Sequence, residues 1–298
     1  MEPNPFPQPT PETVRSWDGY LYFVYERELI RQKKAAGLPA PWTRDLTLMQ
    51  YRFTNIRRRD DRMSKWFIEN LIAPYEEHPD LWFALLVGRI INWPPTLAAL
   101  MRGGVLPCEA SEFDAPMFIG IVQQLAAIDK AYGDAYMVYP AGAGGVKSVN
   151  IAKNTLIPAA RNAPAIRAAI AQQTVEAAVS ELAKGFGVST FTAGQVAADL
   201  TYCKQLSGAT DLYTFAPIGP GSQRGLNLLH GYPYTRKWKQ AEFNECLEQA
   251  QQEIVTELGF NDLTLHDVQN TFCEYSKYAR ASLGVGRPRN IYKPQTAY

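Results

Sequence analysis

The segment Thr54–Arg62 (TNIRRRDDR) carries a dense set of groups that could bind an anion. If this segment is helical, Asn55, Arg58 and Arg62 fall on one face, because they are three and seven residues apart. Asp61 follows Arg58 by three residues and can hold its guanidinium, and a fixed guanidinium binds phosphate as a fork. The pattern predicts a phosphate-binding face, and a surface lattice of ion pairs is the alternative.

A second polar stripe runs along His266–Arg280 (HDVQNTFCEYSKYAR). Thr264 is spaced from Asp267 as in a capping box, so a helix should begin here. Residues at intervals of three and four then share one face, and they are Asp267, Asn270, Glu274 and Lys277. Carboxylates beside an amine can do acid–base chemistry or bind phosphate. They can also simply pair with each other.

A third stripe lies in the expected helix around Thr192–Tyr202. Gln195, Asp199 and Tyr202 lie on one face of it, while the apolar residues face a core. Gln195 could contact a base edge, Asp199 could act as a base, and Tyr202 could stack on a ring. A purely structural role is the alternative.

The segment Gly219–Asn227 (GPGSQRGLN) predicts a tight turn before a helix that Ser222 would cap. Free N–H groups at a helix start attract phosphate. We therefore expect Gly219, Gly221 and Ser222 to touch the DNA backbone, with Arg224 nearby, in the manner of helix-hairpin-helix DNA glycosylases. A plain turn between helices is the alternative.

The segment 142–148 (GAGGVKS) is similar to a Walker loop, but Val146 separates glycine from lysine, so the required spacing fails. No NTP-hydrolysing or kinase domain is predicted from these residues.

The elements that must position these stripes are mostly helical, because helix-period apolar runs cover most of the chain. These runs are residues 17–36, 46–72, 80–91, 94–101, 115–131, 163–184, 192–206, 238–258 and 265–283. Strand alternation is limited to Ala135–Tyr139 and Val146–Ile151, which could form one small hairpin. We expect an all-α fold, with a proline-rich arm over residues 1–15 and a single large helical domain over residues 16–298.

The composition is that of a globular protein, with 298 residues, 46% hydrophobic and 20% charged. The net charge is only +1, yet residues 51–65, 222–239 and 277–293 are basic and residues 240–262 are acidic. Such a distribution fits a cationic cleft for a polyanion, or ordinary solvated helix faces. Four scattered cysteines and three histidines favour neither disulfides nor a metal site, and no membrane span or secretory signal is expected.

Taken in order, five segments resemble the phage α-glutamyl/putrescinyl-thymine pyrophosphorylase family, whose helical domain also occurs joined to 5-hydroxymethyluracil DNA kinases. They are TNIRRRDDR (54–62), GDAYMV (133–138), AADL (197–200), GPGSQRGLN (219–227) and HDVQNTFCEYSKYAR (266–280). Ser276 departs from the pattern, since an acidic residue is expected there.

The resemblance implies that an amine, such as an amino acid or polyamine, displaces phosphate or pyrophosphate from activated 5-hydroxymethyluracil in double-stranded DNA, with the base flipped out. Arg58, Arg62, Arg224 and Lys277 would stabilise the leaving group. Asp199, Glu274 or Asp267, in that order, would take the proton. Tyr202, Tyr275 and Tyr278 would stack on the flipped base. The fold would then resemble the helix-hairpin-helix glycosylases.

The resemblance further implies a host-cytoplasmic protein without a cofactor, with a 5-hydroxymethyluracil DNA kinase as pathway partner. Two other functions remain open. One is a DNA glycosylase that releases free base. The other is a non-catalytic DNA-binding subunit in which the polar stripes are only ion pairs.

Overall fold

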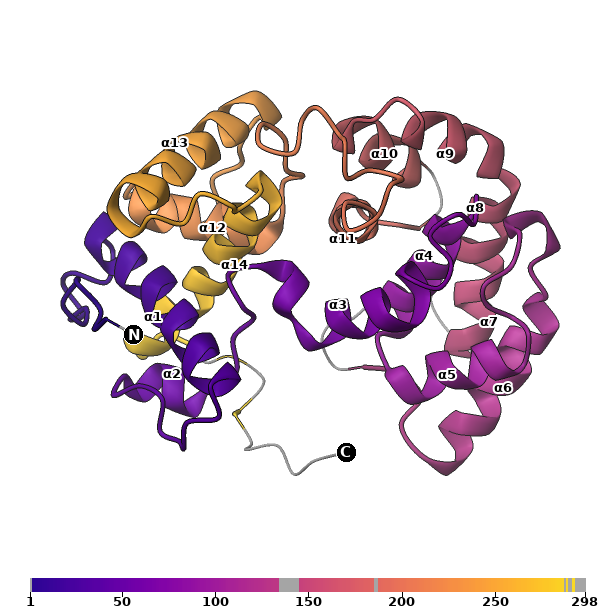
Figure 1. The fold of residues 1–298 in the computed structure, drawn as a ribbon, viewed down its shortest axis with the longest axis horizontal. Coiled ribbons are helices and arrows are strands. Elements are labelled where there is room, and N and C mark those ends of the chain that lie inside the picture. Colours follow the sequence, from indigo (N-terminus) through magenta and orange to yellow (C-terminus); the bar gives the residue numbers. More distant parts are fainter. Residues whose placement is uncertain (1, 134–144, 185–186, 287, 289–290, 293–298) are drawn as a thin grey trace. The chain divides into compact units, whose positions relative to one another are not determined.

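The structure is a computed structural model that describes residues 2–133, 145–184, 187–286, 288 and 291–292. Regular structure in these ranges is helical, and Tyr51 and Ile291 form an isolated antiparallel bridge (Figure 1). The prediction of an all-α fold is confirmed. In the part of the chain that is described, no helix is both long and apolar enough to cross a membrane.

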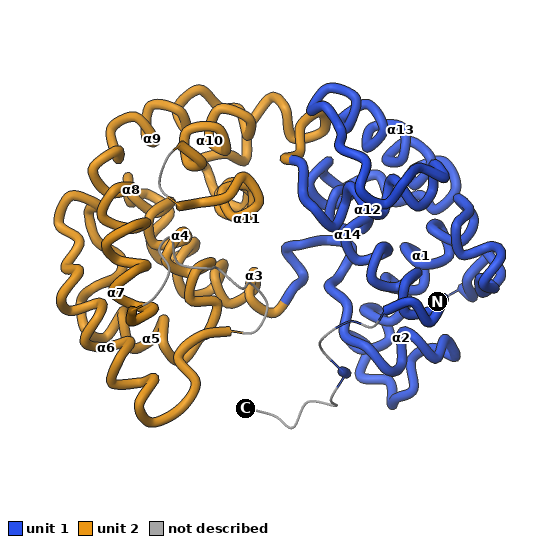
Figure 2. The backbone as a smooth tube through the Cα atoms, turned by 180° about the vertical axis from the view of Figure 1, so that it is seen from behind, with its two compact units in different colours: residues 1–61, 218–298 blue, residues 62–217 orange. Residues whose placement is uncertain are grey.

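The chain divides into two compact units (Figure 2). Unit 1 comprises residues 1–61 and 218–298, and unit 2 comprises residues 62–217. The sequence predicts an arm over residues 1–15 and one helical domain over residues 16–298. These boundaries differ from those of the two units and stay a prediction. The chain leaves unit 1 after residue 61 and returns to it at residue 218, a path that local periodicity does not reveal.

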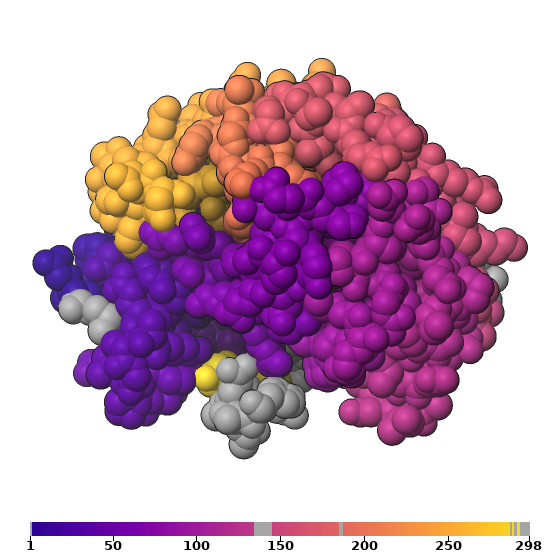
Figure 3. All heavy atoms as spheres, turned by 45° about the vertical axis from the view of Figure 1, so that its right-hand side comes forward, coloured from indigo at the N-terminus to yellow at the C-terminus, as the bar shows by residue number. Residues whose placement is uncertain are grey.

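Unit 1 is built around its last helix, which contacts the other α-helices of the unit. In chain order the helices are α1 (Trp17–Ala35), α2 (Leu46–Gln50), the 3₁₀ turn η1 (Arg58–Asp60), α12 (Pro220–Leu229), α13 (Gln240–Leu258) and α14 (Leu265–Ser282). The start of the chain lies against the C-terminal helices, as the indigo and yellow-orange atoms in Figure 3 show. The predicted capping box between Thr264 and Asp267 is present and begins α14.

Aromatic rings fill the core between α1 and α14. Tyr20 stacks on Phe272 with ring centroids 4.3 Å apart. Tyr275 and Tyr278 are buried, and their hydroxyls donate to the Val14 carbonyl and to Asp45. The expectation that these two rings stack on a flipped base is wrong, because both belong to the core.

The N-terminal arm lies on unit 1. The Asn4 amide donates to the Tyr22 carbonyl oxygen and to Glu26 of α1. Val14, at the end of the arm, is fully buried. The arm is therefore held by side-chain contacts that its proline content alone did not predict.

Helices α12 and α14 approach each other closely. A Cβ atom at Gly221 would lie 2.3 Å from the Cys273 sulfur, and one at Gly225 would lie 2.3 Å from the Phe272 carbonyl oxygen. The two glycines are four residues apart and so share one face of α12. Their lack of side chains is required by helix packing within unit 1.

Unit 2 surrounds a helix with no exposed residue, α4 (Leu81–Ile91), which packs against α11 (Thr190–Leu200). Its other helices are α3 (Arg62–Phe67), the π-helical η2 (Ile68–Ile72), α5 (Pro94–Arg102), the 3₁₀ turn η3 (Ala110–Glu112), α6 (Ala115–Ile128), α7 (Lys147–Ile151), the π-helical η4 (Ala152–Leu156), α8 (Ile157–Arg161), α9 (Ala163–Ile170) and α10 (Val175–Leu182). One contiguous apolar core joins them.

The expected helix over residues 46–72 is wrong. Helix α2 ends at Gln50, no helix forms over residues 51–57, and a new helix begins at Arg62. Contacts distant in sequence replace helical hydrogen bonds here. The Arg27 guanidinium donates to the carbonyl oxygens of Phe53 and Thr54, and Asn55 N–H donates to Asp61. An amphipathic period could not predict these bonds.

The expected strand over Val146–Ile151 is also wrong, since Lys147–Ile151 is helix α7. Ser148 and Ile151 are both buried, and their spacing of three places them on one helical face. The partner strand of the expected hairpin, 135–139, lies outside the described residues. The expected helix over 163–184 divides into α9 and α10, with Gln173 between them at a φ of 54°.

Replacing Gly225 by Ala tests the close approach of α12 and α14. The new methyl would meet a backbone carbonyl, which cannot move aside as a side chain can, so we expect the free energy of unfolding to fall by about 1–3 kcal/mol. Gly120 is the matched control, because a Cβ there, inside α6, meets nothing within 4 Å. Gly120→Ala should instead raise stability by about 0.5–1 kcal/mol. Urea unfolding of both variants checks this, and equal stabilities would contradict the packing.

Candidate functional site

Arg58 is held in unit 1 by three groups. Its backbone N–H donates to Asp267 Oδ1 at 2.8 Å, its Nη1 donates to Asn270 Oδ1 at 3.0 Å, and its Nε lies 3.5 Å from Asp61 Oδ2. The predicted pairing of Arg58 with Asp61 is confirmed. These bonds fix the guanidinium against α14 and leave it nearly fully buried.

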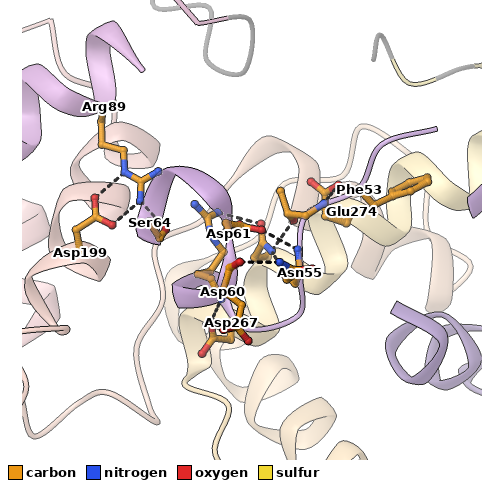
Figure 4. Close-up of polar contacts among 12 residues, drawn as sticks. Phe53, Asn55, Asp60, Asp61, Ser64, Arg89, Asp199, Asp267 and Glu274 are labelled. Atoms are coloured by element: carbon orange, nitrogen blue, oxygen red, sulfur yellow. Dashed lines mark hydrogen bonds and ion pairs between the residues drawn. The ribbon is translucent and has the colours of Figure 1, made fainter. Parts of the chain in front are cut away.

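The same face of α14 continues the network. Asn270 Nδ2 donates to Thr54 Oγ1 at 3.0 Å, and Thr54 N–H donates to Glu274 Oε2 at 3.3 Å. Lys277 Nζ lies 2.5 Å from Glu274 Oε1. Figure 4 shows four residues of this network, Asn55, Asp61, Asp267 and Glu274. We call the set the α14 polar cluster, and its members are Thr54, Asn55, Arg58, Asp61, Asp267, Asn270, Glu274 and Lys277.

Burial dominates the electrostatics of this cluster. It raises the pKa of Asp267, and the hydrogen bonds from Arg58 N–H and Thr264 oppose the rise. It also lowers the pKa of the Arg27 guanidinium, an effect opposed first by Glu274 and then by Asp61. Arg27 was missed by the sequence analysis. It sits in a helix with several charged residues, and nothing in its spacing marks it as the residue that binds segment 53–55.

The cluster combines two cations with three carboxylates, so it has the groups needed to bind an anion and to transfer a proton. In this structure those groups are engaged with one another. Among the charged members Lys277 has the most exposed side chain, at 44%, while its partner Glu274 is buried. To bind a substrate, the charged groups of this cluster would therefore have to give up their bonds to one another and form bonds to the substrate.

The remaining predicted residues of the cleft lie in unit 2. Asp199 is fully buried and accepts from Arg89 through both carboxylate oxygens, the Arg89 Nε bond being 2.6 Å (Figure 4). Arg89 also donates to Ser64 Oγ. Gln195 is buried in the same helix as Asp199, and Tyr202 packs against the apolar core of unit 2. Arg89 was missed, although a lone arginine in the apolar run LWFALLVGRII signals a buried partner.

Five predicted residues thus lie together in unit 1, namely Asn55, Arg58, Asp267, Glu274 and Lys277. Arg62 is an exposed residue at the start of unit 2, and Gln195, Asp199 and Tyr202 lie deeper in that unit. The hypothesis that all of them line one pocket stays a prediction.

The predicted backbone-binding turn begins α12. Gly219 occupies the N-cap position, so the expected cap by Ser222 is wrong. Ser222 lies inside the helix, where its buried hydroxyl donates to the Gly219 carbonyl and Gln269 Nε2 lies 3.1 Å from it. Arg224 is exposed, with its guanidinium carbon 5.3 Å from the Tyr234 ring centroid. Contact of this turn with DNA stays a prediction.

Among the described residues, no three or more His, Cys, Asp or Glu side chains gather in a group that could hold a metal ion. The four cysteines are free thiols.

A family model described as 5-hmdU DNA kinase, helical domain, matches residues 14–285. The match covers most of both units and the whole α14 polar cluster, and the chain belongs to this family of helical domains. One relative is the 5-hmdU DNA kinase of Bacillus phage SP10, which is 26% identical over 303 aligned residues. The alignment covers 90% of this chain and 46% of the relative, so the chain spans less than half of that protein. No solved structure matches.

The Arg89–Asp199 pair makes a prediction about Asp199→Asn. Removing the carboxylate charge takes away the counter-charge of the buried Arg89 guanidinium, which should cost about 3–5 kcal/mol of stability. The double variant Arg89→Met with Asp199→Leu should recover most of the loss. Glu77→Gln, which breaks an exposed pair with Lys204, is the control and should leave stability nearly unchanged. An Asp199→Asn protein of unchanged melting temperature would contradict the structural role.

The raised pKa of Asp267 predicts a pH dependence. In the unfolded chain this carboxyl titrates near 3.8, and in the folded protein it titrates at higher pH, so the folded state binds the proton more tightly. The stabilisation is fully present below pH 3.8 and is lost as the pH rises through the folded pKa. Asp267→Asn should remove this part of the slope. Denaturant unfolding from pH 3.5 upward checks it, and identical slopes for both proteins would refute it.

Proposed function

We propose that this protein acts in thymine hypermodification of phage DNA, as a transferase that replaces the activated oxygen of a 5-hydroxymethyluracil ester by an amine. The observation that carries the proposal is the family match over residues 14–285. The relative from Bacillus phage SP10 bears the name of a kinase for 5-hmdU in DNA. A phosphate ester of that base is the type of substrate that an amine-transferring enzyme would consume.

The proposed step breaks the bond between the exocyclic methylene carbon and the oxygen of the phosphate or pyrophosphate group. It forms a carbon–nitrogen bond to an amino acid or polyamine. The bonding electrons leave with the phosphate, and the amine proton passes to a carboxylate. The enzyme must stabilise the polyanionic leaving group and exclude water, because water would regenerate the hydroxymethyl group.

The α14 polar cluster supplies groups of the required kinds. Arg58 is fixed by Asn270 and Asp61 and would bind the leaving group, with Lys277 as the second cation. Of the three candidate bases, Asp199 is held by both of its oxygens in unit 2. Asp267 and Glu274 lie on the same helix face as Lys277, and we propose that one of them takes the proton. The substrate partners are DNA with a flipped base and a small amine, in the cytoplasm of the infected host, with a 5-hydroxymethyluracil DNA kinase acting earlier.

A second candidate is a non-catalytic DNA-binding subunit of the same pathway. The observation that favours it is the internal pairing of the cluster, since Arg58, Asn270 and Glu274 are buried and bonded to one another or to Thr54. In that case the polar stripe of α14 only anchors segment 53–61.

Nucleoside mass spectrometry distinguishes the candidates. DNA carrying phosphorylated or pyrophosphorylated 5-hydroxymethyluracil is incubated with the protein and a mixture of amines, then digested. A new amine-bearing nucleoside supports transfer, an abasic site supports a glycosylase, and unchanged DNA that is nevertheless bound supports the accessory subunit.

If transfer occurs, Arg58→Ala should lower its rate by about 10²–10³-fold while leaving DNA binding largely intact. Arg59→Ala is the matched control, because Arg59 is the exposed neighbour and should keep full activity. Because Arg58 is buried, circular dichroism must show that the variant folds. Lys277→Met, at a partly exposed position, gives a second test. Full transfer activity in both folded variants would contradict the assignment.

A further inference from the structure

The segment after α12, residues 230–239 (HGYPYTRKWK), presents two tyrosines on the surface of unit 1. Tyr232 is 43% exposed and Tyr234 is 42% exposed. Aromatic rings of this size are costly to leave in water, and exposed tyrosines beside cations are typical of surfaces that bind a partner.

This segment is held in place by one buried side chain. Asn227 is fully buried, and its Nδ2 donates to the carbonyl oxygens of Tyr234 and Arg236. Its Oδ1 accepts from Trp238 Nε1 at 2.7 Å, and its backbone carbonyl accepts from Tyr232 N–H. The loop is therefore ordered before any partner arrives, which lowers the entropic cost of binding.

Rings and a guanidinium form a stack beside the exposed edge of Tyr232. His230 lies parallel to Tyr232 at a centroid distance of 5.5 Å. The Arg236 guanidinium lies 4.3 Å from the Tyr232 ring and 4.1 Å from the Trp238 ring. Arg236 is paired with Glu242 at 2.5 Å. This stack stiffens the loop on which Tyr234 is carried.

Two further guanidiniums, from different helices, contact Tyr234. Arg224 of α12 lies 5.3 Å from its ring centroid, and Arg280 Nη1 of α14 donates to its hydroxyl at 3.1 Å. Within the described residues, neither Arg224 nor Arg280 forms an ion pair with a carboxylate. Residues 222–239 contain four basic residues and no acidic one. The charge beside Tyr234 is therefore left for an external anion.

We infer that Tyr234, Arg224 and Arg280 form a binding surface for single-stranded DNA. The tyrosine ring stacks on a base, and the two guanidiniums bind the flanking phosphates. An aromatic platform beside a cationic track is the arrangement that binds unpaired nucleotides. Intact duplex offers phosphates but hides the faces of its bases, so the surface favours single strands or locally opened DNA. The inference rests on the proposed function only for the choice of DNA.

Fluorescence anisotropy with a labelled, unmodified single-stranded DNA 12-mer tests this surface in the 298-residue chain. Tyr234→Ala should weaken binding about tenfold, as loss of one stacked base does, while Tyr234→Phe should keep most of the affinity. Arg224→Ala and Arg280→Ala should each lower the salt slope by about 0.7. A duplex of the same length should bind more weakly and respond little to Tyr234→Ala.

The controls are Tyr213→Ala, at an exposed tyrosine of unit 2, and Arg44→Ala, at an exposed arginine of unit 1. Both should bind as the unchanged protein does. Equal affinities of Tyr234→Ala and Tyr213→Ala would overturn the inference, as would tighter binding to a single-stranded RNA of the same sequence or to an acidic peptide. Because neither modified base nor amine is present, binding here together with unchanged DNA in the mass spectrometry would reject the transfer reaction and retain this surface.

Discussion

Hydrogen bonding between α14 and the segment 53–58 is the constraint on which unit 1 depends. Helix α14 is enclosed by α1, α2, α12 and α13, so a polar group on it must find a partner inside the protein. Asp267, Asn270 and Glu274 find their partners in residues 54–58, a segment that lies outside the α-helices. Together with Arg27, the polar face of α14 holds the non-helical segment that follows α2.

Close packing of α12 supports the same arrangement from the other side. Gly221 and Gly225 let α12 approach the backbone of α14 at Phe272 and Cys273. Ser222, on the same side, lies within hydrogen-bonding distance of Gln269. Arg224 of α12 and Arg280 of α14 both contact Tyr234, so the two closely packed helices also supply the cations of one surface.

Unit 2 uses a different solution for its buried charge. Arg89 is a residue of the otherwise apolar helix α4. Its guanidinium pairs with the Asp199 carboxylate and donates a hydrogen bond to Ser64 Oγ. A buried pair of this kind contributes little net stability but makes either partner costly to remove. Asp199 is the ion-pair partner of Arg89 within unit 2, whereas Glu274 of α14 combines burial with a neighbouring solvent-exposed lysine.

The sequence by itself determined the helical class, the limits of α1, α4, α13 and α14 to within a few residues, the capping box at Thr264, and the pairs Arg58–Asp61 and Glu274–Lys277. All of these depend on neighbours three or four residues apart, which periodicity detects. The non-helical segment 51–57, the role of Arg27, the partner of Asp199 and the packing role of Gly221 and Gly225 were decided only by the tertiary structure. Their bonds and contacts join residues that are distant along the chain, and no local pattern encodes which distant group will arrive.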